Sequence, residues 1–279
     1  MKFSKMQGIG NDYIYVNCFE ETVENPNRVS EIVSNRRFGI GSDGLILIMP
    51  SEKADFKMRM FNADGSEGMM CGNGIRCVGK YVYDRKMTGK TEITVETLSG
   101  IKYLTLFPDE NDKIRTVSVN MGKAVIKPEF IPVSLSGESI ISQPLKIGEK
   151  VWNITCVSMG NPHAVVFVED PYMENLEETG PLFEKNDIFP ERVNTEFVKV
   201  IDSNTLKMRV WERGSGETLA CGTGACASAV AAVLNGFCKY DDKIKVILRG
   251  GELEIIFKTD GTVIMNGPAA HVFDGEINI

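Results

Sequence analysis

The sequence predicts a mixed α/β (α+β) protein made of two pseudo-symmetric, strand-rich halves. Each half is expected to be a curled sheet or barrel around a central helix, with the active site in the cleft between the halves. Three observations predict this: a gapless internal repeat, many short segments rich in β-branched and aromatic residues, and one inner helix per half. The 279 residues, 43% hydrophobic and 25% charged, suit one large or two modest globular domains.

Shifting the chain by 150 residues aligns its second half with its first. The segment "KMRMFNADGSEGMMCGNG" at 57–74 falls on "KMRVWERGSGETLACGTG" at 207–224, and seven of the eighteen positions are identical. The same shift places "GNDYIYV" at 10–16 on "GNPHAVV" at 160–166. A shared strand–loop–helix pattern is the simpler explanation, but it does not account for cysteines and asparagines at equal spacing. A duplicated domain accounts for both.

The duplication predicts two domains with one cysteine each at the cleft. The N-terminal half covers residues 1–120 together with a C-terminal strand at about 266–279, and its internal repeat covers residues 121–265. The shift pairs Cys71 with Cys221, so each side of the cleft is expected to contribute one thiol.

Strands are predicted wherever β-branched and aromatic residues lie between turn residues. In the first half they cover 43–50, 56–62, 91–107 and 115–122; in the second half they cover 151–160, 163–170, 194–201, 205–212, 243–248, 252–258 and 262–267. An outer helix is expected at 27–37, and an inner helix follows Gly74. The segment "ACASAVAAVLNG" at 225–236 is small and apolar on every side, which indicates a helix buried inside a curled sheet.

Composition excludes several classes of protein. The formal net charge is −7 and no run of basic residues forms a patch, which disfavours binding to nucleic acid or to an anionic membrane. No apolar run approaches the roughly 20 residues of a membrane span, and the N-terminus lacks the apolar core of a signal peptide. We therefore expect a cytoplasmic protein.

Neither a disulfide scaffold nor a metal site is predicted. The seven cysteines are odd in number and irregular in spacing, no C-x-x-C pair occurs, and His163 and His271 lie far apart. The segment "GIGSDG" at 39–44 matches G-x-G-x-x-G, but it lacks the preceding strand and the following helix of a dinucleotide site. No cofactor is expected.

Cys71-Gly-Asn-Gly and Cys221-Gly-Thr-Gly each place a thiol just before a helix. The backbone N–H groups in the first turn of a helix lack partners inside it, and with the peptide dipoles they favour negative charge. We therefore expect two exposed thiols with lowered pKa values. The other cysteines, namely Cys18, Cys77, Cys156, Cys226 and Cys238, are interpreted as core residues.

Two thiols at one cleft predict inversion of a carbon acid. One cysteine removes a proton as the thiolate and the other returns a proton to the opposite face as the thiol, with no cofactor. The two helix N-termini would stabilise the carbanion through its α-carboxylate.

At these residues the sequence resembles the diaminopimelate epimerase family over essentially its whole length. The resemblance is carried by the segments "GNDYIYV", "FGIGSDGLILI", "FNADGSE", "CGNGIRC", "GNPHAVVFV", "RVNTEF", "WERGSGETLACGTGACA" and "MNGPAAHVFDGEI". It implies an isomerase that interconverts LL- and meso-2,6-diaminopimelate in lysine and peptidoglycan biosynthesis, independent of PLP or any other cofactor. It also implies a homodimer with a contact at Phe273, and a small-molecule substrate, with no nucleic acid and no membrane as partner.

The resemblance also assigns roles to individual residues. It places the acid/base thiols at Cys71 and Cys221, and makes His163 and Glu212 modulators of their pKa values. Substrate contacts are implied for Asn11, Asn62, Gly72, Asn73, Asn161, Asn194, Glu212, Arg213, Gly222 and Thr223. Many members carry Gln where this chain has Gly44, so Gly44 is not expected to provide a side-chain contact.

Other interpretations of these residues stay open. Asn11 and Asn161 are also typical turn formers, Glu212 and Arg213 also fit an exposed charged pair, and His163 also fits a buried histidine with satisfied hydrogen bonds. Glu67 and Glu217, which match in the repeat, are interpreted as structural. Alternative functions are a related cofactor-free isomerase, such as a proline or hydroxyproline racemase or a phenazine-biosynthesis isomerase, and a non-catalytic amino-acid-binding or thiol-sensing protein.

Overall fold

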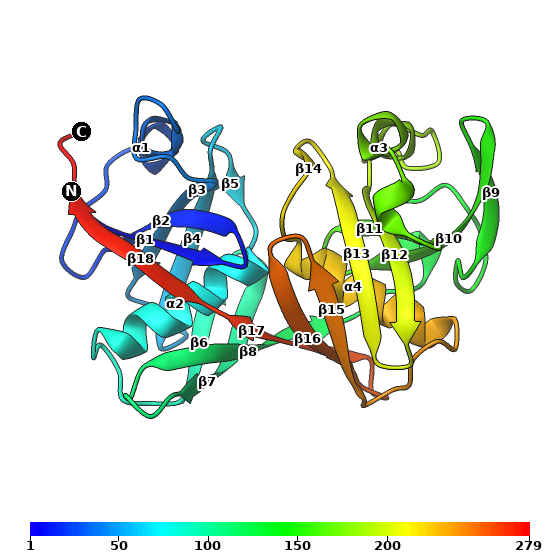
Figure 1. Ribbon diagram of the computed structural model, residues 1–279. Coiled ribbons are helices and arrows are strands. Elements are labelled where there is room, and N and C mark those ends of the chain that lie inside the picture. Colours follow the sequence, from blue (N-terminus) through cyan, green and yellow to red (C-terminus); the bar gives the residue numbers. More distant parts are fainter. The chain divides into compact units, whose positions relative to one another are not determined.

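The computed structural model describes residues 1–279, which form two compact units (Figure 1). Unit 1 comprises Met1–Asn120 and Asn266–Ile279, and unit 2 comprises Met121–Met265. The fold is mixed α/β with many strands and few helices, which confirms the predicted fold class. None of the helices combines the length and the apolar character that crossing a bilayer requires.

Unit 1 contains two helices and a set of short strands. Its helices are α1 (Pro26–Ser34) and α2 (Gly72–Asp84). Its strands are β1 (Lys2–Gly8), β2 (Asn11–Asn17), β3 (Gly44–Met49), β4 (Phe56–Asn62), β5 (Glu67–Gly68), β6 (Glu92–Thr97), β7 (Gly100–Pro108) and β18 (Ala270–Glu276). Strand β8 (Ile114–Lys123) begins in this unit.

Unit 2 also contains two α-helices and a set of short strands, and it adds two 3-10 turns. Its helices are α3 (Leu176–Glu184) and α4 (Gly222–Leu234), with 3-10 turns η1 (Pro128–Phe130) and η2 (Pro171–Met173). Its strands are β9 (Gln143–Ile147), β10 (Lys150–Ser158), β11 (Pro162–Phe167), β12 (Asn194–Asp202), β13 (Thr205–Glu212), β14 (Gly216–Glu217), β15 (Lys243–Leu248) and β16 (Gly251–Phe257). Strand β17 (Thr262–Pro268) begins in this unit.

Strand pairing repeats between the units in the same register. In unit 1, β2 pairs parallel with β3 and places Tyr13 opposite Gly44; in unit 2, β11 pairs parallel with β12 and places His163 opposite Asn194. The antiparallel pairs β3–β4 and β12–β13 continue the match, as do β4–β5 and β13–β14. Each residue pair of unit 2 has the numbers of a pair of unit 1 plus 150. Residues that match in the repeat therefore lie on the same face of equivalent strands.

Each unit wraps its strands around one helix (Figure 1). Helix α2 contacts β1, β2, β7 and β18, and α4 contacts β10, β11, β12, β13, β15 and β16. Every α4 residue except Thr223 and Leu234 is buried. The Ala, Val, Cys and Ser side chains of α4 are small, and this lets strands approach from all sides.

Two helices differ from the sequence prediction. Helix α1 ends at Ser34 instead of residue 37, because the Asn35 side chain accepts the backbone N–H groups of Arg37 and Phe38 and forms a turn. Helix α3 was not predicted, because "LEETGPLFE" contains a glycine and a proline. The glycine is needed here: a Cβ at Gly180 would lie 2.3 Å from the Trp211 ring.

Five cysteines are interpreted as core residues, and replacing a single one by alanine tests this interpretation. Cys226 lies on α4 with no exposed surface, so we expect Cys226→Ala to lower the free energy of unfolding by about 1 kcal/mol. Cys18 is only half-buried, so Cys18→Ala should cost less. Urea unfolding of both variants measures the difference, and an equal cost would contradict the burial seen at Cys226.

Candidate active site

Each inner helix begins directly after a cysteine that caps its N-terminus. Cys71 precedes Gly72 of α2, and its Sγ accepts the Gly74 N–H at 3.3 Å. Cys221 precedes Gly222 of α4, and its Sγ accepts the Gly224 N–H at the same distance. Both cysteines have extended backbones, so the two caps are alike in geometry.

In unit 1, polar groups from β2 surround the Cys71 thiol. The thiol donates to Asn11 Oδ1 at 3.3 Å, and Asn11 Nδ2 donates to Asp43 Oδ2 at 2.7 Å, which fixes the orientation of the amide. The Tyr13 hydroxyl is a further hydrogen-bond partner of the thiol. The guanidinium of Arg76, which has no exposed surface, adds a positive charge nearby.

In unit 2, a chain of hydrogen bonds runs from a buried carboxylate toward Cys221. Glu196 Oε1 lies 2.7 Å from His163 Nδ1, and neither residue has exposed surface. His163 Nε2 lies 3.0 Å from Asn161 Oδ1, and Asn161 Nδ2 donates to Thr223 Oγ1 at 3.4 Å. The Thr223 hydroxyl lies 3.6 Å from Cys221 Sγ. This chain of hydrogen bonds links three predicted site residues, namely His163, Asn161 and Thr223, to the Cys221 thiol. Glu196, which was not predicted, begins the chain.

Glu212, at the end of β13, faces the same thiol. Burial raises the pKa of the Glu212 carboxyl, while hydrogen bonds to Thr218 and Cys221 lower it. Thr218 donates its hydroxyl to Glu212 Oε1, which anchors the carboxylate beside the helix N-terminus. The prediction that Glu212 influences a cysteine has this contact as its structural basis.

The thiols differ from the sequence expectation in exposure and in the direction of their pKa shifts. Cys71 is half-buried and Cys221 is 4% exposed, so the adjacent glycines do not expose Cys221. Burial raises the pKa of the Cys71 thiol, and the Gly74 N–H and Tyr13 hydroxyl offset part of that effect. Burial raises the pKa of the Cys221 thiol well above its ordinary value, and the negative charges of Glu212 and Glu196 raise it further.

This difference between the thiols follows from substitutions at equivalent repeat positions. Tyr13, Ile46, Asn62 and Arg76 of unit 1 correspond, at the 150-residue shift, to His163, Glu196, Glu212 and Cys226 of unit 2. Unit 1 thus places a cation beside its thiol, and unit 2 places two carboxylates beside its own. The electrostatic environment makes Cys71 the more acidic of the two thiols.

The remaining predicted binding residues lie at strand ends and in the first turns of the two inner helices. Asn194 donates Nδ2 to Pro162 O at 2.9 Å and accepts the Arg213 N–H at 2.9 Å. The Arg213 guanidinium is exposed and donates to Glu191 O. In unit 1, Asn62 ends β4 and donates to Ser66 Oγ. The predicted helix-start residues Gly72, Asn73, Gly222 and Thr223 form the first turns of α2 and α4.

Gly44, Glu67 and Glu217, which are not predicted to contact substrate, have structural roles. A Cβ at Gly44 would lie 2.1 Å from Phe61 O, so this backbone has no room for a side chain here, as expected for a residue without a side-chain contact. Glu67 forms a two-pronged ion pair with Arg59, and Glu217 forms the same pair with Arg209. These equivalent pairs tie β5 to β4 and β14 to β13.

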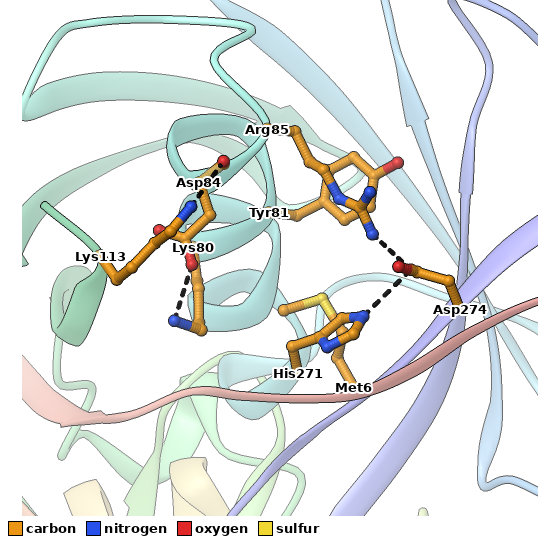
Figure 2. A pocket seen from close by; sticks show the side chains of 8 residues that line it. All are labelled: Met6, Lys80, Tyr81, Asp84, Arg85, Lys113, His271 and Asp274. Carbon is orange, nitrogen blue, oxygen red and sulfur yellow. Dashed lines mark hydrogen bonds and ion pairs between the residues drawn. The ribbon is translucent and has the colours of Figure 1, made fainter. Parts of the chain in front are cut away.

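A cavity of about 340 Å³ in unit 1 is lined by Met6, Lys80, Tyr81, Asp84, Arg85, Lys113, His271 and Asp274 (Figure 2). None of these residues is a predicted substrate contact. Its cations are already engaged: Lys80 pairs with Asp84, Arg85 and His271 both contact Asp274, and Lys113 donates to Asp84 O. The cavity therefore lacks the free charges that a dicarboxylate would need.

Sequence reasoning missed Tyr13, Arg76 and Glu196. Tyr13 and Glu196 lie inside the quoted segments "GNDYIYV" and "RVNTEF", and Arg76 follows the "CGNG" loop. The available signal was the repeat itself, because each of the three replaces a residue of different charge or polarity at the equivalent position. No group of three or more His, Cys, Asp or Glu side chains is placed to hold a metal ion.

The family model and relatives of high sequence identity indicate one family. The family model described as Diaminopimelate epimerase matches residues 3–127 and 155–272. A diaminopimelate epimerase from Acetivibrio thermocellus is 59% identical over 280 residues, covering 100% of this chain and 99% of the relative. One from Agathobacter rectalis is 58% identical over 287 residues, covering all of both chains.

Solved structures of other proteins share the fold at low identity. A phenazine biosynthesis protein of the PhzF family from Bacillus anthracis is 17% identical with a TM-score of 0.73, covering 100% of this chain and 99% of that one. A probable proline racemase from Agrobacterium radiobacter K84 is 12% identical with a TM-score of 0.72, covering 100% and 93%. These similarities concern the fold alone.

The two thiols should titrate at different pH values. Because burial and two carboxylates act on Cys221 while Arg76 and Tyr13 act on Cys71, we expect Cys71 to reach half-maximal alkylation at the lower pH. Iodoacetamide labelling over a pH series, followed by peptide mass mapping, gives each midpoint independently of absolute rate. Cys77, whose pKa burial raises to about 11, is the unreactive control. A lower midpoint for Cys221 than for Cys71 would contradict this order.

Proposed function

Because this chain belongs to the diaminopimelate epimerase family, we propose that it interconverts LL- and meso-2,6-diaminopimelate by inverting one α-carbon without a cofactor. The observation that carries the proposal is the pair of cysteine caps: equivalent thiols begin equivalent buried helices in two units of the same topology. Inversion requires one group on each face of the carbon, and a duplicated site supplies two.

The proposed reaction moves one proton off the α-carbon and a different proton onto it. Cys71, the more acidic thiol, reacts as the thiolate and takes the α-proton from one face. Cys221, whose proton is retained by burial and by its two carboxylate neighbours, donates its thiol proton to the opposite face. Cys71 is then the thiol and Cys221 the thiolate, which is the arrangement that the reverse reaction needs.

Stabilisation of the carbanion is proposed to come from the helix N-termini. The first-turn N–H groups of α2 and α4 have no partners inside the helices, and they point toward the caps where an α-carboxylate would gather negative charge. Fixed dipoles in a site without water stabilise developing charge strongly, so they lower the barrier to proton removal.

The rest of the substrate is proposed to be held by polar groups around the caps. Arg213 is exposed and has a fork of donors for the distal carboxylate, and Glu212 is a partner for an ammonium group. Asparagine amides both donate and accept, which suits a molecule with two carboxylates and two ammonium groups. The proposed contacts are Asn11, Asn62, Gly72, Asn73, Asn161, Asn194, Glu212, Arg213, Gly222 and Thr223.

We place the reaction in the cytoplasm, within lysine and peptidoglycan-precursor biosynthesis. All seven cysteines are free, and a mechanism that needs two reduced thiols fits a reducing compartment. A proline racemase remains the second candidate on fold alone. The carboxylate of Glu212 and the guanidinium of Arg213 favour a substrate with a second charged end.

The test combines inversion with hydrogen exchange. In deuterated water, the protein should convert LL-diaminopimelate to the meso form with deuterium at the α-carbon. Cys71→Ala and Cys221→Ala should each lower inversion by about 10²–10⁴-fold or more, because each direction needs one acid and one base. Replacement by Ser should cost nearly as much, since an alcohol is a far weaker acid than a thiol.

Buried cysteines away from the caps provide matched controls. Cys77→Ala and Cys226→Ala should retain inversion, because neither sulfur caps a helix. Near-normal inversion by either Cys71→Ala or Cys221→Ala would overturn the two-thiol assignment. Turnover of L-proline instead of diaminopimelate would favour the racemase, and no turnover of either would favour an amino-acid-binding or thiol-sensing protein.

We further propose a homodimer with Phe273 at its contact. Phe273 lies on β18, 42% exposed, beside Val272 at 52% exposed, and its ring packs edge-on against Phe3. Sedimentation should show a species of twice the 30.9 kDa chain mass, and Phe273→Asp should shift it toward the single chain because a charge cannot be buried there. Exposed Phe130→Asp is the control, and a wild-type protein that sediments only as one chain would exclude the dimer.

A further inference from the structure

Glu196 is a buried carboxylate in β12, one of the two carboxylates that act on the Cys221 thiol. It has no exposed surface, and its Oε1 lies 2.7 Å from His163 Nδ1. Its second oxygen, Oε2, is buried without a hydrogen-bond partner. Burying a carboxylate costs several kcal/mol unless a partner compensates it, so the contact with His163 is the interaction that retains Glu196 here.

The hydrogen bonds of His163 determine where its protons lie. Asn161 directs Oδ1 at Nε2 while its Nδ2 donates to Thr223, so Nε2 must carry a hydrogen to donate. The other ring nitrogen, Nδ1, faces Glu196 Oε1 at 2.7 Å. Glu196 thereby holds His163 in one orientation, and through Asn161 it fixes the Thr223 hydroxyl 3.6 Å from Cys221 Sγ.

The equivalent position in unit 1 shows that this carboxylate is specific to unit 2. A Cβ at Gly224 would lie 2.6 Å from Glu196 Oε1, and a Cβ at Gly74 would lie 2.6 Å from Ile46 Cδ1. The two side chains therefore occupy the same place under the two caps. The Cys71 cap packs against the apolar side chain of Ile46, and the Cys221 cap packs against the carboxylate of Glu196.

Charged and titratable groups approach Cys221 from three strands. Glu196 comes from β12, His163 from β11 and Glu212 from β13, and α4 contributes the Thr223 hydroxyl and the Gly224 N–H. Glu212 already has Thr218 as a donor. Glu196 is the carboxylate whose only partner is the histidine.

We infer that Glu196 is a positioning residue, which orients Thr223 beside Cys221 through His163 and Asn161 and keeps the proton on Cys221 between turnovers. The inference rests on the proposed function, and it adds that the acid–base asymmetry of the two thiols is built into unit 2 by one carboxylate. Substrate then meets a base at one cap and an acid at the other without a prior proton transfer between them.

Glu196→Gln tests this by removing the charge while keeping the shape. The neutral amide no longer repels a thiolate at Cys221, so the alkylation midpoint of Cys221 should fall by about one pH unit. The midpoint of Cys71, measured by peptide mapping in the same labelled chain, should stay where it is. Glu217→Gln, which removes a carboxylate of unit 2 paired with Arg209, should leave both midpoints unchanged.

An unchanged Cys221 midpoint in Glu196→Gln would overturn the inference. An equal shift of the Cys71 midpoint in Glu196→Gln, or of the Cys221 midpoint in Glu217→Gln, would overturn it as well. Alkylation needs no turnover, so this outcome is separate from whether the protein epimerises diaminopimelate. If Glu196→Gln does not fold, wild-type protein labelled with ¹⁵N-histidine tests the orientation of His163 that the inference requires, and its spectrum is simple because the chain has only two histidines. A His163 signal with Nε2 unprotonated would overturn the arrangement, and a protonated Nε2 would support it.

Discussion

The structure depends on one local interaction: a cysteine sulfur that accepts a backbone N–H at the start of a buried helix. In each unit this cap gives an otherwise unpaired donor a partner, so the helix can begin deep among strands without leaving that polar group unsatisfied. The same geometry leaves the thiol beside the positive end of the helix. In each unit, the residue that caps the helix is therefore also the residue to which the proposed reaction assigns the proton transfer.

Burial and hydrogen bonding act on these thiols in opposite directions, and burial prevails at both. The consequence is that the pKa of each thiol lies above its ordinary value, and that of Cys221 is raised further than that of Cys71. A proton donor and a proton acceptor are both needed for inversion. In the proposed reaction, thiols that ionised freely would give two bases and no acid, and the raised pKa of Cys221 fits the proton-donor role proposed for it.

The internal repeat provides two caps with the same backbone, and different side chains at equivalent positions make the caps chemically different. The strand registers are preserved between the units, while Ile46 and Glu196, or Tyr13 and His163, occupy equivalent places. Related folds with low identity to this chain show that the scaffold tolerates wide changes in sequence. The two thiols differ in pKa because the side chains packed against the two caps differ, and a single side chain there changes the local charge.

The sequence by itself determined the repeat, the strand-rich fold class and the position of both thiols before helices. These features are periodic or local: alternating apolar residues, glycines after a cysteine, and a constant shift of 150 residues are all visible along the chain. It also indicated the burial of Cys77 and Cys226, because each lies among apolar residues at helical spacing. Helix α3 was missed, because packing against Trp211 overrides its poor helix propensity.

Only the tertiary structure decided which charges meet at each thiol and how deeply the thiols are buried. Glu196 and Cys221 are far apart in sequence, and their proximity comes from the pairing of β11 and β12 next to α4. The burial of Cys221 likewise results from strands that surround α4 on several sides, which glycine content does not reveal. A pKa depends on everything within a few ångströms in space, so its direction cannot be obtained from neighbours along the chain.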